Sequence, residues 1–232
     1  MHVRRLIGSL LATTLAATTL VAVATTAPAS AATPVTIISG TSGKPWIYPS
    51  SYRSQRGAPV AGSSLSVSVN VTAPGVETVY AGTVAVQRLV PGSSWKTVLT
   101  SANAYLYDTL KVVSNAQYRV VYSGGTNYQG SFDPAVSAGK TIKAQRKLTT
   151  STLSGRKAGF KGKISPKKKV KIVVLKKQGK KYKKFKTLRT SKKGRFTVVL
   201  PAPRRGKFFW KIIFKGDKKF QPSTIKGNTY KY

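Results

Sequence analysis

The chain has 232 residues and a formal net charge of +37 at pH 7, because 41 residues are lysine or arginine and only 4 are aspartate or glutamate. It contains no cysteine, which excludes a disulfide-stabilised scaffold and any cysteine-based catalytic or metal site. Its one histidine is His2, so histidine-dependent catalytic triads and zinc sites are excluded from the rest of the chain.

Residues 1–32 have the layout of a secretory signal peptide. Two arginines stand close to the start, and a stretch of mainly Leu, Ala, Val and Thr follows them. Ala29-Ser30-Ala31 then forms a small-x-small cleavage site, and we expect cleavage near Ala31 or Ala32. A transmembrane anchor is the alternative, but Thr and Ala dilute the apolar stretch. Residues 33–232 contain no second apolar run near the ~20 residues that a membrane helix needs.

The remaining chain falls into two parts that differ in charge. Residues 33–145 contain 9 basic and 3 acidic residues, whereas residues 146–232 contain 30 basic residues and a single acidic residue, Asp217. We therefore expect two domains with these bounds, joined by a linker near Lys143 to Lys147. Of the 30 basic residues in the second part, 24 are lysine and six are arginine.

In the first part the predicted elements are strands. The segment from Gly40 to Gly62 is interpreted as an early strand followed by a long loop. Beyond it, apolar residues alternate with polar ones over a run of eight positions. These apolar residues are Leu65, Val67, Val69 and Val71. This period of two is typical of a strand with one buried face. A hairpin is expected further on, in VAVQRLVPGSSWKTV from Val84, with its turn at Pro91-Gly92.

The second part shows the same alternation more regularly. Seven strands are predicted near residues 148–153, 158–164, 169–175, 182–189, 194–200, 207–215 and 224–231. Turn signals lie between them at Gly179, Lys193-Gly194 and Gly216-Asp217. No amphipathic helix of useful length is predicted after the signal peptide, so the expected class is all-β.

The two parts also repeat each other. AQYRVVYSGGTNYQGS from Ala116 aligns without a gap to FFWKIIFKGDKKFQPS, and VAVQRLVPGSSWKTV aligns to VKIVVLKKQGKKYKKF with one inserted residue. The matched pairs include Tyr118 with Trp210, Val120 with Ile212, Tyr122 with Phe214, Val84 with Val170, Trp95 with Tyr182, and Val98 with Phe185. A repeat of about 90 residues is too long for a solenoid unit. It predicts two tandem antiparallel β-sandwich domains of one fold after the signal peptide.

A spaced pattern in the second repeat resembles the bacterial immunoglobulin-like repeats of secreted actinobacterial proteins. The residues that carry it are Val170-Lys171-Ile172, Tyr182-Lys183, Gly194-Arg195-Phe196, Trp210 to Phe214, Gly216, Phe220 and Ser223. The first repeat departs from the pattern, because Tyr105-Leu106-Tyr107 stands where Gly-Arg-Phe is expected, so the pattern does not define its middle strands. The resemblance implies an extracellular, non-enzymatic domain for adhesion, binding or spacing, and it carries over no catalytic residue.

The residues themselves offer little for catalysis. With no histidine or cysteine and four dispersed carboxylates in residues 33–232, we predict no enzyme activity, no metal site and no cofactor. Asp217 could belong to an exposed recognition tripeptide, Lys215-Gly216-Asp217, but a turn in which the carboxylate bonds to its own backbone is the favoured interpretation. Tyr182, Phe185 and Trp210 could stack on nucleic-acid bases. Their counterparts recur in the weakly charged repeat, so we expect all three in the core.

The lysines are the remaining functional signal. In PKKKVKIVVLKKQGKKYKKFKTL from Pro166, 11 of 23 residues are lysine, and apolar residues interrupt them at strand spacing. The candidate polyanion-binding residues are Lys167, Lys168, Lys169, Lys171, Lys176, Lys177, Lys180, Lys181, Lys183, Lys184 and Lys186. Lysine is a flexible point charge, so its excess over arginine favours binding to polyanions without sequence specificity. Solubility alone is the simpler explanation, although it needs a smaller charge.

These observations predict a secreted, non-catalytic binding or adhesion protein that charge retains at the cell envelope. Its expected partners are anionic cell-wall polymers, such as teichoic-type polymers, or acidic polysaccharides. Extracellular nucleic acid or anionic lipid is the alternative within the same class. A carbohydrate-binding or enzyme-inhibitory module is the alternative from another class, with its site in the loop around Trp46 and Tyr48, where exposed rings could bind sugars or could simply cap the sandwich.

Overall fold

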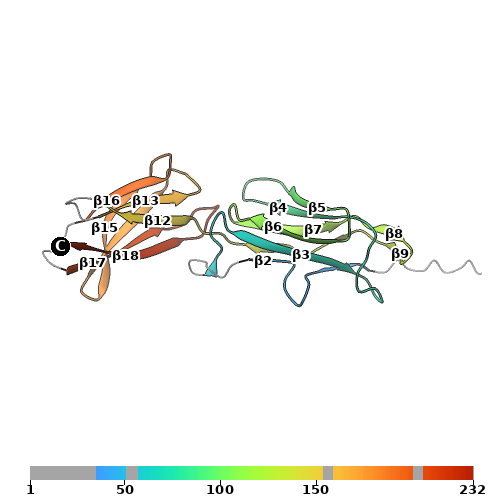
Figure 1. Cartoon of the computed structure of the whole chain (residues 1–232). Coiled ribbons are helices and arrows are strands. Elements are labelled where there is room, and N and C mark those ends of the chain that lie inside the picture. Colours follow the sequence, from blue (N-terminus) through green and yellow to red (C-terminus); the bar gives the residue numbers. More distant parts are fainter. Residues whose placement is uncertain (1–34, 51–56, 154–158, 201–205, 232) are drawn as a thin grey trace, which may run out of the picture. The chain divides into compact units, whose positions relative to one another are not determined.

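The computed structural model describes residues 35–50, 57–153, 159–200 and 206–231 (Figure 1). The predicted signal peptide at residues 1–32 lies outside the described residues. Within the described residues the regular elements are strands, with no helix, which confirms the all-β class. All the pairings between these strands are antiparallel, and the strands of residues 33–145 and of residues 147–231 form separate sheets.

The first repeat has two main sheets. Its strands are β1 (Ile37–Ser39), β2 (Ile47–Pro49), β3 (Ser64–Thr72), β4 (Val84–Leu89), β5 (Lys96–Ser101), β6 (Tyr105–Lys111), β7 (Ala116–Tyr122), β8 (Gly125–Asn127), β9 (Gly130–Phe132), β10 (Ala135–Val136) and β11 (Lys140–Ile142). In one sheet β6 pairs with one edge of β3, and β1 and β2 share the other edge. In the second sheet β7 pairs with β4, β4 with β5, and β10 and β11 share the remaining edge of β7.

The second repeat is more regular, and each of its seven predicted strands is present. They are β12 (Lys147–Thr152), β13 (Gly159–Ser165), β14 (Lys171–Gln178), β15 (Lys181–Arg189), β16 (Arg195–Val199), β17 (Gly206–Phe214) and β18 (Ser223–Lys231). They form a three-stranded sheet in the order β12-β13-β16 and a four-stranded sheet in the order β15-β14-β17-β18 (Figure 1). Gly179 and Gly194 take positive φ angles of 57° and 71° at the predicted turns, where a side chain would be strained.

The core consists of the alternating apolar residues that the sequence indicated. Leu65, Val67, Val69 and Val71 of β3 are buried, as are Phe196 and Val198 of β16 and Trp210, Ile212 and Phe214 of β17. In the second repeat the core joins the two sheets, because the Phe160 ring of β13 lies 4.4 Å from the Trp210 ring of β17. A buried aromatic contributes its large apolar area together with such ring contacts.

Two buried tyrosines contribute to the core of the first repeat. Tyr118 and Tyr122 of β7 are fully buried, and the Tyr122 hydroxyl donates to the carbonyl oxygen of Ala81 at 2.9 Å. Burial raises the pKa of both phenols. Phe214 occupies the place of Tyr122 in the second repeat, as the sequence repeat predicts.

The strand register confirms the internal repeat and corrects one of its alignments. Val86 lies opposite Val120, and Val174 lies opposite Ile212, so Val86 is the counterpart of Val174. The sequence alignment that paired Val84 with Val170 is therefore displaced by two residues in this strand. Both hairpins have a bulge directly after these valines.

The bulge explains why the rest of the hairpin alignment is correct. Val98 and Phe185 are the extra residues of the two bulges, and both pack against the core. The pairs Val98 with Phe185 and Trp95 with Tyr182 are therefore structurally equivalent. Side chains that follow a bulge lie on the face opposite to the one that strict alternation predicts. The bulge therefore determines which lysines of this hairpin lie on each face of the sheet.

The early part of the first repeat agrees with its prediction. Trp46 is 8% exposed and Ile47 is fully buried, and Ile47 begins β2, which pairs with β3. The early strand expected between Gly40 and Gly62 is therefore β2, an edge strand, and part of the loop expected after it lies outside the described residues. The middle strands that the pattern did not define are present, with β6 paired along most of β3.

The substitution Gly227→Ala is expected to destabilise the second repeat by about 1–3 kcal/mol, the usual cost of overpacking a core. Gly227 lies opposite Trp210, and a β-carbon there would stand 2.3 Å from a carbon of the indole ring. Urea unfolding of the 33–232 chain measures the change. Gly139→Ala is the matched control, because a β-carbon at Gly139 meets no atom within 4 Å, and it should leave stability nearly unchanged.

Candidate polyanion-binding surface

The four-stranded sheet of the second repeat has one apolar face and one basic face. Val174 and Ile212 lie opposite each other and are buried, so they define the inner face. Their neighbours along the strands point outward, because side chains alternate across a strand. Lys211 lies opposite both Leu175 and Lys226 and is therefore on the outer face.

Like charges face each other directly on the outer face. Lys211 pairs with Lys226 across β17 and β18, and Lys171 pairs with Arg189 across β14 and β15. Opposed like charges on one sheet face are unfavourable by tenths of a kcal/mol each, roughly up to 1 kcal/mol. The fold of the first repeat forms without them, so these lysines reduce the stability of the sheet rather than support it.

The structure divides the eleven predicted lysines into four groups. The connection between β13 and β14 contains Lys167, Lys168 and Lys169, and the outer face contains Lys171, Lys177 and Lys184. The opposite side contains Lys176, Lys183 and Lys186, and the hairpin tip contains Lys180 and Lys181. All are exposed except Lys176, which is half-buried. They surround the hairpin and do not form one patch. Further lysines of this sheet's outer side are not among the predicted ones, including Lys211, Lys215 and Lys226.

A groove of ≈ 630 Å³ lies on the outer face of this sheet. Half-buried Val173, Leu175 and Ile213 line it together with Thr187. Five lysines also line it, Lys168, Lys169, Lys171, Lys184 and Lys215. Four of them are among the predicted lysines, whereas the apolar lining was not predicted, because Val173, Leu175 and Ile213 have the pattern of ordinary strand residues in the sequence.

The three aromatic residues considered for base stacking do not all lie in the core. Trp210 is buried as expected, but Tyr182 is only half-buried, and the Lys211 ammonium lies 3.8 Å from the centre of its ring. The first repeat contains the same pair, with the Arg119 guanidinium 4.4 Å from the Trp95 ring. Because both repeats cover this ring with a cation, the pair belongs to the fold and is not a base-stacking platform.

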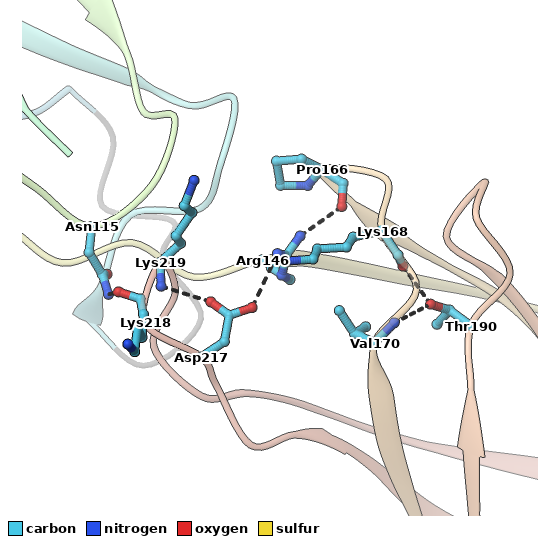
Figure 2. A network of polar contacts seen from close by, with 9 residues as sticks. All are labelled: Asn115, Arg146, Pro166, Lys168, Val170, Thr190, Asp217, Lys218 and Lys219. Carbon is cyan, nitrogen blue, oxygen red and sulfur yellow. Dashed lines mark hydrogen bonds and ion pairs between the residues drawn. The ribbon is translucent and has the colours of Figure 1, made fainter. Parts of the chain in front are cut away.

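Asp217 neutralises a buried arginine (Figure 2). Arg146 is 2% exposed, and its Nη2 lies 3.3 Å from Asp217 Oδ2. Its Nη1 donates to the carbonyl oxygen of Pro166 at 2.8 Å, and its guanidinium lies 4.1 Å from the Phe220 ring centre. Asp217 Oδ1 accepts from the backbone N–H of Lys219 at 2.8 Å, which confirms the turn interpretation. Both carboxylate oxygens are engaged, which argues against an exposed recognition tripeptide.

The predicted linker is short and largely buried. Between β11 and β12, Ala144, Gln145 and Arg146 are 0%, 3% and 2% exposed. The Ala144 N–H donates to Asn115 Oδ1 at 2.8 Å, and the Asn115 N–H donates to the carbonyl oxygen of Lys219 at 2.7 Å. The sequence composition offered no sign of this network, because Asn115 and Lys219 are far apart in the chain.

The alternative site around Trp46 is not supported. The Trp46 indole belongs to the core, so it caps the sandwich and offers no exposed ring to a sugar. Tyr48 is half-buried, with the Lys44 ammonium 5.7 Å from its ring centre. In the part of the chain that the structure describes, no three His, Cys, Asp or Glu side chains gather where they could hold a metal ion. The same residues contain no helix long and apolar enough to span a membrane.

The thermal midpoint of residues 33–232 is expected to rise with salt. The second repeat has 30 basic residues and one acidic residue, and salt screens repulsion beyond about 8 Å at 0.15 M. We expect an increase of roughly 5 °C between low salt and about 0.5 M NaCl, which for a chain of this size corresponds to about 1–2 kcal/mol. Differential scanning calorimetry measures it. A midpoint that stays constant across the salt series would show that this repulsion is negligible.

Comparison with protein-family models and with curated proteins finds no match for this chain.

Solved structures are similar in fold. The segment of two fibronectin type-III domains from chicken tenascin has a TM-score of 0.41 and 13% identity, over 75% of this chain and 94% of that one. A tetra-tandem repeat from the extending region of a large adhesion protein has a TM-score of 0.33 and 12% identity, over 84% of this chain and 50% of that one. A structure concerned with host cell surface retention of a 1.5-MDa bacterial ice-binding adhesin has a TM-score of 0.27 and 11% identity, over 85% and 64% of the two chains. This chain therefore spans less than two thirds of the two adhesin chains, and at such identities the similarity concerns the fold alone.

Proposed function

We propose that this protein is a secreted, non-catalytic binding module whose second repeat, residues 146–232, attaches to anionic polymers of the cell envelope. Teichoic-type polymers and acidic polysaccharides are the proposed partners. The observation that supports this most strongly is the contrast between the repeats: the same sandwich forms in the first repeat with 9 basic and 3 acidic residues, whereas the second has 30 and one.

The proposed mechanism is charge neutralisation with release of counterions. The lysines lie on the outer face, on the hairpin tip and on the connection before β14, so a flexible chain can contact them along several paths. Each neutralised anionic group releases condensed counterions, and the affinity then falls steeply with salt. No described helix could enter a nucleic-acid groove, and lysine lacks the planar fork of arginine, so the binding is expected to be independent of sequence.

Retention at the envelope follows from the same charges. A protein exported by the predicted signal peptide would meet a polyanionic matrix at the cell surface, and multiple weak contacts would hold it there. The first repeat would then serve as a spacer or as a second binding face. No described residue supports a catalytic role, and we propose none.

Co-sedimentation across a salt series tests the proposed function. Residues 33–232 are mixed with cell-wall preparations, with DNA and with anionic lipid vesicles, and the bound fraction is measured at increasing NaCl. We expect the tightest and most salt-resistant binding to the wall preparation. Preferred binding to DNA or to vesicles would replace the proposed partner with the alternative one. Equal, weak binding to all three at physiological salt would leave solubility as the only role of the charge.

A further inference from the structure

The groove on the outer face of the second repeat has an apolar floor on an otherwise basic surface. Val173, Leu175 and Ile213 are side by side, because Val173 lies opposite Ile213 and Leu175 is two positions further along β14. All three are half-buried and point away from the core. The groove volume of ≈ 630 Å³ lies within the range of about 300–1,000 Å³ that small-molecule sites occupy.

The fold does not require this apolar floor. By strand register, Ala85 and Gln87 of β4 are the counterparts of Val173 and Leu175. In the first repeat Gln87 Oε1 accepts a hydrogen bond from Arg119 Nε at 2.8 Å, which covers the same place with polar groups. Because the second repeat has Leu175 where the first has Gln87, it exposes apolar area to water, which is unfavourable for the isolated protein. An apolar groove with a few charged groups beside it is a common form of ligand site.

The charged side chains around the groove are mostly lysines. Lys168, Lys169, Lys171, Lys184 and Lys215 line it, and none of them has a carboxylate partner among the described residues. Asp217 also lines it, but its carboxylate is bound to Arg146 and to the Lys219 N–H. A ligand that complements this groove has an apolar body and an anionic group beside it.

We propose that this groove binds the lipid end of an anionic envelope molecule, with one acyl chain on the floor of Val173, Leu175 and Ile213 and its phosphate or carboxylate among the surrounding lysines. The inference rests on the proposed function and specifies it, because it adds an amphiphile site to a surface otherwise suited to any polyanion. Charge complementarity together with the apolar floor favours this occupant over a fully polar polymer, which would leave Leu175 exposed to water.

Binding of alkyl phosphates to residues 33–232 tests the site. Isothermal titration with butyl, octyl and dodecyl phosphate, each below its micelle concentration, measures the contribution of the chain. We expect the affinity to rise by about two- to fourfold for each added CH₂ until the groove is filled. Dodecyl maltoside, which has the chain without the charge, and glycerol phosphate, which has the charge without the chain, should each bind at least tenfold more weakly.

A repeat-swap variant keeps the fold while it removes the floor. Val173→Ala together with Leu175→Gln introduces the residues that the first repeat already has at these places. We expect at least a tenfold loss of dodecyl phosphate affinity, with polyphosphate binding unchanged within about twofold. The variant Lys184→Thr, which introduces the counterpart Thr97, should weaken both ligands.

The outcomes distinguish the amphiphile site from the polyanion surface. Dodecyl phosphate that binds no better than butyl phosphate, or equally well to the repeat-swap variant, overturns the amphiphile site, while retained polyphosphate binding leaves the proposed function intact. If the unmodified protein does not bind polyphosphate, both the amphiphile site and the proposed function are overturned. Circular dichroism and the unfolding midpoint confirm that the repeat-swap variant is folded, so a loss of binding is assigned to the groove.

Discussion

Replacement of six hairpin lysines by glutamine is expected to reduce polyanion affinity on the order of 10²–10³-fold at low salt. The six are Lys176, Lys177, Lys180, Lys181, Lys183 and Lys184, which lie at the free end of β14 and β15 and at the turn between them. For a flexible polyanion, each lysine charge removed lowers the slope of log affinity against log salt by up to about 0.7, so the slope should decrease by roughly 4. Fluorescence titration with labelled polyphosphate measures both the affinity and the slope.

The matched control replaces the same six lysines by arginine. It keeps the charge and changes the head group, so the affinity should stay within about threefold of the unmodified protein if charge alone carries binding. The glutamine variant is expected to remain folded, because five of the six side chains are exposed and the sixth is half-buried. Unchanged affinity of the glutamine variant would place the binding elsewhere in the chain.

Asp217→Ala is expected to destabilise the second repeat by about 3 kcal/mol, near the lower end of the cost of breaking a buried ion pair. The substitution leaves the Arg146 guanidinium buried, with the Pro166 carbonyl oxygen as its one remaining hydrogen-bond acceptor among the described residues. The lower end applies because the Asp217 side chain is 31% exposed, so water can replace part of the interaction. Urea unfolding at fixed ionic strength measures the decrease in stability.

Two further variants separate the ion pair from other effects of Asp217→Ala. Asp133→Ala removes the same charge from an exposed residue and should change stability by less than about 0.5 kcal/mol. Arg146→Met combined with Asp217→Ala removes both charges and should recover part of the stability, because a buried pair is often replaceable by apolar groups. If Asp133→Ala costs as much as Asp217→Ala, the effect comes from the added net charge and not from the buried arginine.

The alternation of apolar residues predicted most of the second repeat because every one of its strands has a buried face. Phe196, Val198, Trp210 and Ile212 are in the core for the predicted reason, the period of two in a half-buried strand. The short edge strand β2 was expected only as an early strand between Gly40 and Gly62 without bounds, since three residues that include Pro49 produce no periodic signal. Its burial depends on pairing with β3, which is a tertiary property.

The candidate site was predicted in composition but not in arrangement. Strict alternation would place Lys184 and Lys186 on one face, but the bulge at Phe185 puts them on opposite faces. The apolar floor was also hidden, because Leu175 has the same signal in sequence whether it faces the core or the solvent. The pair of Arg146 and Asp217 joins residues 71 positions apart, a distance over which local patterns carry no information.

The central claim, that function resides in the basic surface of the second repeat, is tested most directly by lysine footprinting. Residues 33–232 are acetylated with and without a purified anionic wall polymer, and mass spectrometry measures the protection of each lysine. We expect protection to concentrate on the hairpin and groove lysines of the second repeat. The five lysines of the first repeat, Lys44, Lys96, Lys111, Lys140 and Lys143, are exposed and should react equally in both samples. Protection that is equal in the two repeats, or greater in the first, would contradict the claim.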